Sequence, residues 1–250
     1  MTFSRSYFLL IVCFVLLSCD TDDNSENCDV SFKATDIRNE ILVSYNKSCE
    51  SCLRNLLDDW GNAFMPDMNI ADSIKPIYEV YKEVYSPWAL ERISNSEWGD
   101  GIYKDISYYI IQDSINYDFN FDKDYDENGL MTIKRFRPEI ANDAITTLYL
   151  NDDYREAINC FLGADGFNQH SEEEKMNRYK YLNSYLFLFH GHWGNYWHLE
   201  THPEISRISF NEAVDKAKVY FRLGYEGGEI LLDKNGAKWD IVDWEMIWIE

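Results

Sequence analysis

Four of the five histidines lie within thirteen residues of the second half of the chain, namely His190, His192, His198 and His202. If this segment forms two strands joined by a tight turn at Gly194-Asn195, alternate residues share a face, so His190 lies beside His192, and His198 lies beside Glu200 and His202. Three imidazoles and a carboxylate suit Zn²⁺ and leave one position for a water that the metal acidifies. The cluster raises the hypothesis of a zinc-dependent hydrolase.

In that hypothesis Glu204 would serve as the general base. The spacing nevertheless matches no established zinc signature, since the chain contains no H-E-x-x-H. Pro203 is expected to end the strand, which would direct His202 away from the other histidines. The alternative interpretation is that these histidines lie at the polar ends of an aromatic cleft and donate hydrogen bonds there.

Aromatic residues gather around the same expected turn, where Trp193, Tyr196 and Trp197 follow one another closely. Aromatic rings with polar neighbours are typical of surfaces that stack on sugars or bind proteins. No G-x-S-x-G, P-loop or G-x-G-x-x-G motif occurs. The preferred interpretation is therefore a binding cleft without catalysis, and its predicted lining consists of Trp193, Trp197, His198, Glu200 and Tyr225.

Four cysteines, Cys28, Cys49, Cys52 and Cys160, follow Cys19, and in an exported protein they can pair in three ways that sequence does not separate. Cys49 and Cys52 form a C-x-x-C, which in redox proteins lies at the N-terminus of a helix. Here apolar residues recur at helical spacing on both sides of the motif, which predicts that both cysteines face the core from the interior of one helix. This pattern favours packing, or a bridge to Cys28 or Cys160, over thiol chemistry.

The elements that would position these residues are helices first and strands last. Helices are expected over residues 34–60, 76–85 and 151–163, strands over 109–121 and 131–137, and a charged connection over 172–178. Further strands are expected over 181–193, 196–201, 217–225, 230–232 and 239–249, with turns at Gly227-Gly228 and Asn235-Gly236. This order predicts an α+β fold in which N-terminal helices pack on a C-terminal antiparallel sheet.

Two N-terminal helices followed by a meander of long strands ending in tryptophan resemble the cone-shaped NTF2-like fold. The resemblance covers residues 34–250, which we expect to form a single domain. It implies a cleft between the helices and the sheet.

The composition of the chain is strongly acidic, with a formal net charge of −21. Such a charge repels phosphate backbones, so nucleic acid is not expected as a partner. It also opposes close contact with anionic lipid, whereas a basic protein would be attracted. An acidic immunity-type protein that neutralises a basic toxin is therefore a further hypothesis.

The N-terminus carries Arg5 and then an apolar run over residues 7–17. This run is shorter than the about 20 residues that a membrane-spanning helix needs, and it is typical of a secretory signal. Leu16 and Ser18 before Cys19 resemble the lipobox of bacterial lipoproteins, which implies a signal peptide over residues 1–18 and acylation of Cys19. Residues 19–33 would then form the lipid anchor and an acidic tether.

The acidic residues after Cys19 are similar to the export signal of Bacteroidota lipoproteins, which implies display on the outer face of the outer membrane. The sequence as a whole therefore predicts a surface lipoprotein held in the membrane by Cys19. Its helix–sheet cleft is expected to bind an oligosaccharide or a protein partner.

Overall fold

The computed structural model describes residues 30–94, 102–103, 105–122, 129–140, 144–164, 167, 170–191 and 197–249. The helices within these ranges are α1 (Phe32–Asn46), α2 (Glu50–Ala63), α3 (Lys75–Val84), α4 (Asp152–Leu162) and α5 (Glu172–Asn183), with a short 3₁₀ turn at Leu90–Arg92. The strands are β1 (Tyr108–Gln112), β2 (Ser114–Asp118), β3 (Met131–Lys134), β4 (Thr146–Leu150), β5 (Phe189–His190), β6 (Trp197–His198), β7 (Glu204–Phe210), β8 (Lys216–Leu223), β9 (Glu226–Asn235) and β10 (Lys238–Ile249).

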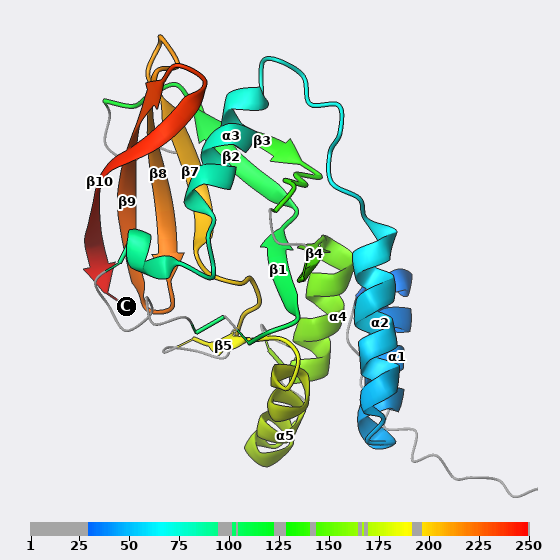
Figure 1. The fold of residues 1–250 in the computed structure, drawn as a ribbon. Coiled ribbons are helices and arrows are strands. Elements are labelled where there is room, and N and C mark those ends of the chain that lie inside the picture. The colour runs from blue at the N-terminus through cyan, green and yellow to red at the C-terminus, as the bar shows by residue number, and fades with distance from the viewer. Residues whose placement is uncertain are drawn as a thin grey trace, which may run out of the picture.

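The main sheet has six strands in the order β10-β9-β8-β7-β2-β3. Every neighbouring pair in it is antiparallel except β2 and β7. Helix α3 covers one face of this sheet, and α1, α2, α4 and α5 lie together beyond β1 and β4 (Figure 1). Pro76 in the first turn of α3 and apolar residues at helical spacing explain why this segment packs as a helix. The predicted α+β fold is confirmed.

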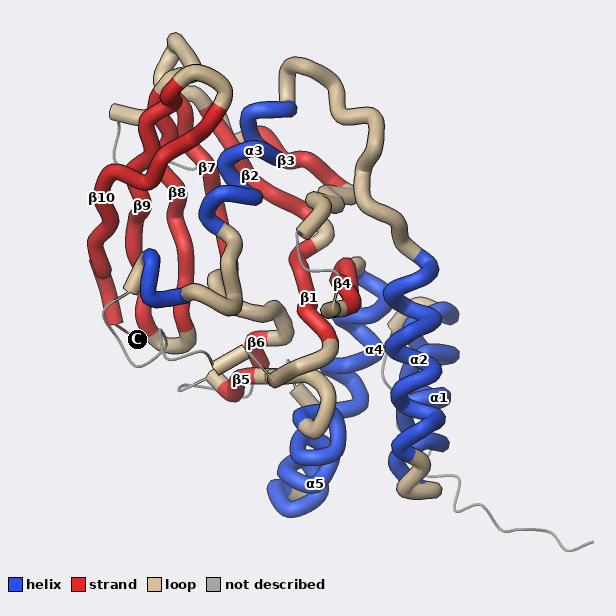
Figure 2. The backbone as a smooth tube through the Cα atoms, in the orientation of Figure 1, coloured by secondary structure: helices blue, strands red, loops and turns tan. Residues whose placement is uncertain are grey.

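A small parallel sheet of β1 and β4 lies between the six-stranded sheet and the helices α1, α2, α4 and α5 (Figure 2), and its side chains contribute to two hydrophobic cores. Along β1, Tyr109 and Ile111 belong to the core beneath α3, whereas Tyr108 and Ile110 belong to the core of the helical part. The reason is that successive side chains of a strand point to opposite faces. Both cores therefore use β1 and β4 as a common wall. The prediction of a single domain over residues 34–250 stays a prediction.

Two predicted elements are each divided in the structure. The expected helix over residues 34–60 is two helices, because Ser48 adopts the left-handed conformation (φ 48°) and ends the regular spacing. The expected strand over 109–121 is interrupted at Asp113, so that β1 and β2 join different sheets. The sequence does not show this break, because apolar residues occur on both sides of Asp113. Strand β1 is buried on both faces and β2 is buried on one face.

Other predictions for the second half were wrong in identifiable ways. Residues 172–178 begin α5 instead of a connection, since Ser171 caps the helix by accepting a hydrogen bond from the amide of Glu174. Of the aromatic stretch 181–193, the described residues 181–191 contribute only β5 as a strand. Gly227 and Gly228 lie inside β9, where a Cβ would clash with the Trp248 ring or the Glu245 carbonyl, and the turn comes earlier in the chain.

The strands β4 and β7 were not predicted, whereas the helix α3, the strand β8 and the turn at Asn235-Gly236 between β9 and β10 are confirmed. No helix in the described part of the chain is long and apolar enough to span a bilayer. The predicted signal peptide, Cys19 and Cys28 lie outside the described residues.

Candidate functional site

The predicted histidine cluster is only partly described, because His192 and Trp193 lie outside the described residues. His190 pairs with Trp197 across β5 and β6, and its ring lies 4.5 Å from the indole. The rings of His198 and His202 are 6.1 Å apart and both are buried. Within the described ranges, no three His, Cys, Asp or Glu side chains form a group that could hold a metal ion. His190, His198 and His202 therefore do not converge on one point.

The described residues that were predicted to line an aromatic cleft contact other side chains and backbone groups of the fold. Trp197, His198 and Glu200 are buried, and the Trp197 ring lies 4.5 Å from that of Tyr179. The Tyr225 hydroxyl donates a hydrogen bond of 3.2 Å to the His190 carbonyl. A cleft with a strongly charged lining lies elsewhere in the described chain.

Buried charges surround the predicted general base Glu204. Its carboxylate lies 3.8 Å from the imidazole of His198, and nearby Glu200 forms an ion pair with Arg155. Burial and the charge of Glu204 raise the pKa of the Glu200 carboxyl, although Arg155 opposes that shift. Burial lowers the pKa of His202 to about 3, which keeps this imidazole neutral at physiological pH.

Arg155 connects this buried group to a large open cleft. The cleft has a volume of about 830 Å³ and lies between the helical part and β3, at the point where β1 gives way to β2. Its lining is polar and rich in charge, and consists of Lys33, Ala63, Phe64, Asp113, Ser114, Thr132, Lys134, Arg135, Arg137, Leu150, Asn151, Asp152, Asp153 and Arg155.

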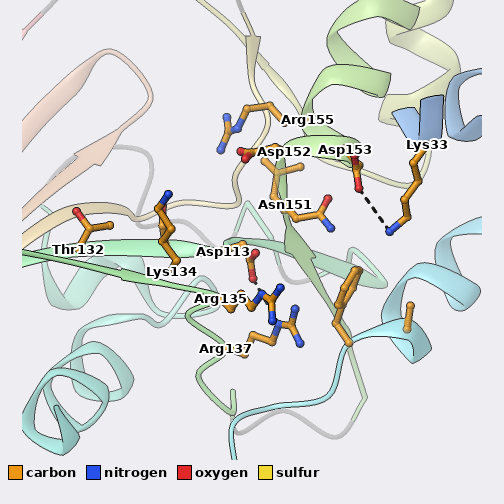
Figure 3. Close-up of a pocket in the computed structure, with 14 residues that line it drawn as sticks. Lys33, Asp113, Thr132, Lys134, Arg135, Arg137, Asn151, Asp152, Asp153 and Arg155 are labelled. Atoms are coloured by element: carbon orange, nitrogen blue, oxygen red, sulfur yellow. Dashed lines mark hydrogen bonds and ion pairs between the residues drawn. The ribbon is translucent and has the colours of Figure 1, made fainter. Parts of the chain in front are cut away.

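One wall of the cleft is formed by the residues around Asp113 and the end of β3 (Figure 3). The Arg137 guanidinium donates to the Asp113 carboxylate at 3.4 Å and lies 4.5 Å from the centre of the Phe64 ring. Burial raises the pKa of Asp113, although Arg137 and Arg135 oppose that shift. These contacts fix the Arg137 guanidinium on an aromatic surface at the edge of the cleft.

Arg135 is the residue on this wall with an uncommon backbone conformation. Its φ is 57°, a left-handed conformation that a non-glycine residue adopts at a free-energy cost of about 1–3 kcal/mol. This conformation directly follows β3 and changes the direction of the chain between Lys134 and Arg137. Among the described residues, Lys134 and Arg135 have no carboxylate within ion-pair distance.

The opposite wall is formed by the N-terminal turns of α1 and α4. Lys33 lies 3.4 Å from Asp153, as the dashed line in Figure 3 shows, and Asn151 caps α4 by accepting a hydrogen bond from the Tyr154 amide. Arg155 extends from the same helix, where the buried Glu200 raises the pKa of its guanidinium against the effect of burial. The Arg155 guanidinium therefore stays charged, and its ion pair with Glu200 holds it in position at the cleft.

Charge distinguishes this cleft from the rest of the molecule. Five lysine and arginine residues and three aspartates line it, in a chain that has almost twice as many acidic as basic residues. Two of the cations have no ion pair among the described residues, so the cleft can accept negative charge from a ligand. Neutral hydrogen-bonding groups come from Ser114, Thr132 and Asn151.

The prediction from the sequence missed this cleft, although a local signal was present. Lys134, Arg135 and Arg137 are three cations within four residues of an acidic chain, and such clusters are typical of anion-binding surfaces. The alternation of residues in this segment predicts only the second strand of a hairpin. Lys33 and Arg155 also line the cleft, but they come from distant parts of the sequence, so no local pattern predicts that they lie near Arg137.

No known protein-family model, curated protein or solved structure matches the chain. The NTF2-like cone therefore stays a prediction, and the functional argument depends on the residues of the cleft.

Proposed function

We propose that this protein is a lipid-anchored binding protein, held in the outer membrane through Cys19, whose helix–sheet cleft binds an acidic oligosaccharide without catalysing its conversion. The observation that carries the proposal is the convergence of cations from three separate elements on one cleft, where Lys134 and Arg135 form no ion pair with a carboxylate of the described chain. Its volume of about 830 Å³ lies within the usual range for small-molecule sites, about 300–1,000 Å³.

The arrangement of the cations supports a carboxylate-bearing ligand. Arginine recognises carboxylates through paired, planar hydrogen bonds, and Arg137 is held in a defined orientation by Phe64 and Asp113. The three aspartates on the lining would repel a densely charged ligand but tolerate one with separated charges. The hydroxyl and amide groups of Ser114, Thr132 and Asn151 suit the hydroxyl groups of a sugar.

The anchor and the surface location rest on the sequence of residues 1–26, as a lipobox and an acidic tether. A lipid-anchored protein displayed outside the cell would meet charged saccharides there. The zinc-dependent hydrolase and the acidic immunity-type protein stay hypotheses, and no contact among the described residues favours either of them.

The experiment is a calorimetric titration of the purified protein with short uronic acid oligosaccharides and with neutral oligosaccharides of the same length. Saturable binding is expected for the acidic series alone, and it should weaken as salt is added. The Arg135→Gln and Arg137→Gln variants are each expected to weaken binding about tenfold or more, since a hydrogen bond to a charged group contributes about 1.5–3 kcal/mol.

Lys216→Gln is the matched control. This substitution also removes one positive charge, but Lys216 pairs with Asp233 on the exposed surface outside the cleft. This variant is expected to bind as the unchanged protein does. Equal binding of neutral and acidic oligosaccharides, or equal effects of all three variants, would contradict the proposal.

A further inference from the structure

The disulfide between Cys49 and Cys52 occupies a position that the sequence did not predict. The chain leaves α1, passes the left-handed Ser48, and begins α2 at Glu50 with Cys49 as its N-cap. The prediction that both cysteines face the core was wrong, because Cys52 is exposed and Cys49 is only partly buried. The predicted bridge from this motif to Cys28 or Cys160 was also wrong, because Cys49 and Cys52 are bonded to each other, and Cys160 takes part in another disulfide.

This bridge constrains the fold very little. It joins residues three positions apart, and the stabilisation that a disulfide provides through loop closure is smallest for the shortest loops. Helix α2 is already held against the rest of the molecule by three buried apolar side chains, Leu53, Leu57 and Trp60. A structural role therefore explains the presence of the bridge poorly.

The two sulfur atoms lie in different chemical environments. The Cys49 sulfur accepts a hydrogen bond of 3.3 Å from the Cys52 amide at the N-terminus of a 14-residue helix. An amide donor and the positive end of a helix both stabilise a thiolate. Cys49 is thus the better leaving group, while the exposed Cys52 is the sulfur that an incoming thiol can reach.

A surface groove leads to Cys52. It has a volume of about 450 Å³ and is lined by α1 and α2, with the half-exposed Val43 and with Leu56 as its apolar residues. Glu40 and Asp59 add negative charge to the same groove. This lining suits an extended peptide segment with apolar and basic residues next to its cysteine.

We propose that the Cys49–Cys52 disulfide is a thiol–disulfide exchange site that oxidises cysteines in peptide segments bound along this groove. The substrate thiolate attacks the Cys52 sulfur, forms a mixed disulfide and releases Cys49 as a thiolate. A second substrate thiolate then attacks the substrate sulfur of the mixed disulfide and releases Cys52. The substrate loses two electrons and forms a disulfide, and the pair Cys49 and Cys52 takes up those electrons and two protons.

The first test uses the unaltered full chain in buffers of reduced and oxidised glutathione, followed by alkylation and peptide mapping by mass spectrometry. The Cys49–Cys52 bond is expected to open and close reversibly with the glutathione ratio, while the bond of Cys160 stays closed throughout. A Cys49–Cys52 bond that resists reduction as strongly as the bond of Cys160 would overturn the proposal.

The second test traps the substrate. In each single-cysteine variant the remaining cysteine is first converted to its mixed disulfide with glutathione, so that an incoming peptide thiolate displaces glutathione as a thiolate. Cys49→Ser prepared in this way is expected to capture a basic, cysteine-containing peptide at Cys52 about tenfold faster than it captures an acidic peptide of the same length. Cys52→Ser, the matched variant, is expected to capture the basic peptide more slowly because Cys49 is less accessible. Equal rates for the two peptides, or faster capture by Cys52→Ser, would contradict the assigned groove and the assigned order of attack.

Discussion

The buried ion pair between Asp118 on β2 and Arg207 on β7 gives the sharpest test of the packing in the main sheet. Both side chains are 1% exposed, and the Arg207 guanidinium lies 5.3 Å from the centre of the Tyr220 ring. The Asp118 carboxylate also accepts hydrogen bonds from the Ser209 hydroxyl at 3.2 Å and from the Asn120 amide at 2.8 Å. The pair thus joins the only two parallel neighbours of this sheet within the described residues.

Arg207→Ala leaves the Asp118 carboxylate buried without its counter-ion. Removing one partner of a buried ion pair costs about 3–5 kcal/mol of unfolding free energy, because an uncompensated charge stays in a poorly solvated site. Asp118→Ala is expected to cost a similar amount. Replacing both partners by apolar residues, Asp118→Leu with Arg207→Met, is expected to cost much less than the sum, since neither charge is then left behind.

The assay is urea unfolding at equilibrium, in which the midpoint and slope give the free energy of unfolding for each variant. Lys216→Ala is the matched control, because the Lys216–Asp233 pair is about half exposed on both sides and such pairs contribute about 0–1 kcal/mol. Two results would refute the reasoning. One is a cost of Arg207→Ala as small as that of Lys216→Ala. The other is a cost of the Asp118→Leu/Arg207→Met double variant as large as the sum of the costs of Arg207→Ala and Asp118→Ala.

Two further predictions concern acid and helix packing. Because burial lowers the pKa of His202 to about 3 from 6.5, the folded protein binds fewer protons than the unfolded protein between these values. The contribution of His202 to the free energy of unfolding is therefore full above pH 6.5 and is lost as the pH drops toward 3, by at most about 1.4 kcal/mol per pH unit. His202→Asn should reduce this dependence of the unfolding free energy on pH, as measured by urea unfolding. An unchanged dependence would contradict the buried, neutral state of His202. In a helix, alanine is favoured over glycine by about 1 kcal/mol. Gly61→Ala should nevertheless lower the thermal stability, because the added Cβ would lie 2.3 Å from Thr146 Cγ2. In a Thr146→Ser background, which lacks that methyl group, the same change should stabilise, and stabilisation in both backgrounds would contradict this packing.

Sequence patterns predicted the elements whose signals are local. The alternation of apolar and polar residues along β8, the Asn235-Gly236 turn and the proline at the start of α3 all specify their structures within a few residues. The break at Ser48 has no glycine or proline to mark it. The turn at Asp113 is hidden because apolar residues continue on both sides of it.

The candidate cleft could be predicted only in part, for the same physical reason. The run from Lys134 to Arg137 is visible in the sequence, whereas Lys33 and Arg155 reach the cleft because α1 and α4 pack side by side. The buried environment of His202 likewise depends on its distant neighbour Tyr103, whose hydroxyl accepts a hydrogen bond from the His202 amide. Patterns of three to four residues contain no information about such contacts.

The wall of β1 and β4 has a mechanical consequence for the cleft. Asp113 follows β1 directly and Asn151 follows β4 directly, so the two sides of the cleft are attached to the ends of two hydrogen-bonded strands. Opening the cleft by a hinge motion would separate the β1–β4 sheet from one of the two hydrophobic cores and expose Tyr109 or Ile110 to water. The gap between the two sides is therefore set before a ligand arrives. An incoming ligand then meets a preorganised site, in which selectivity follows from the spacing of the ligand's own charges.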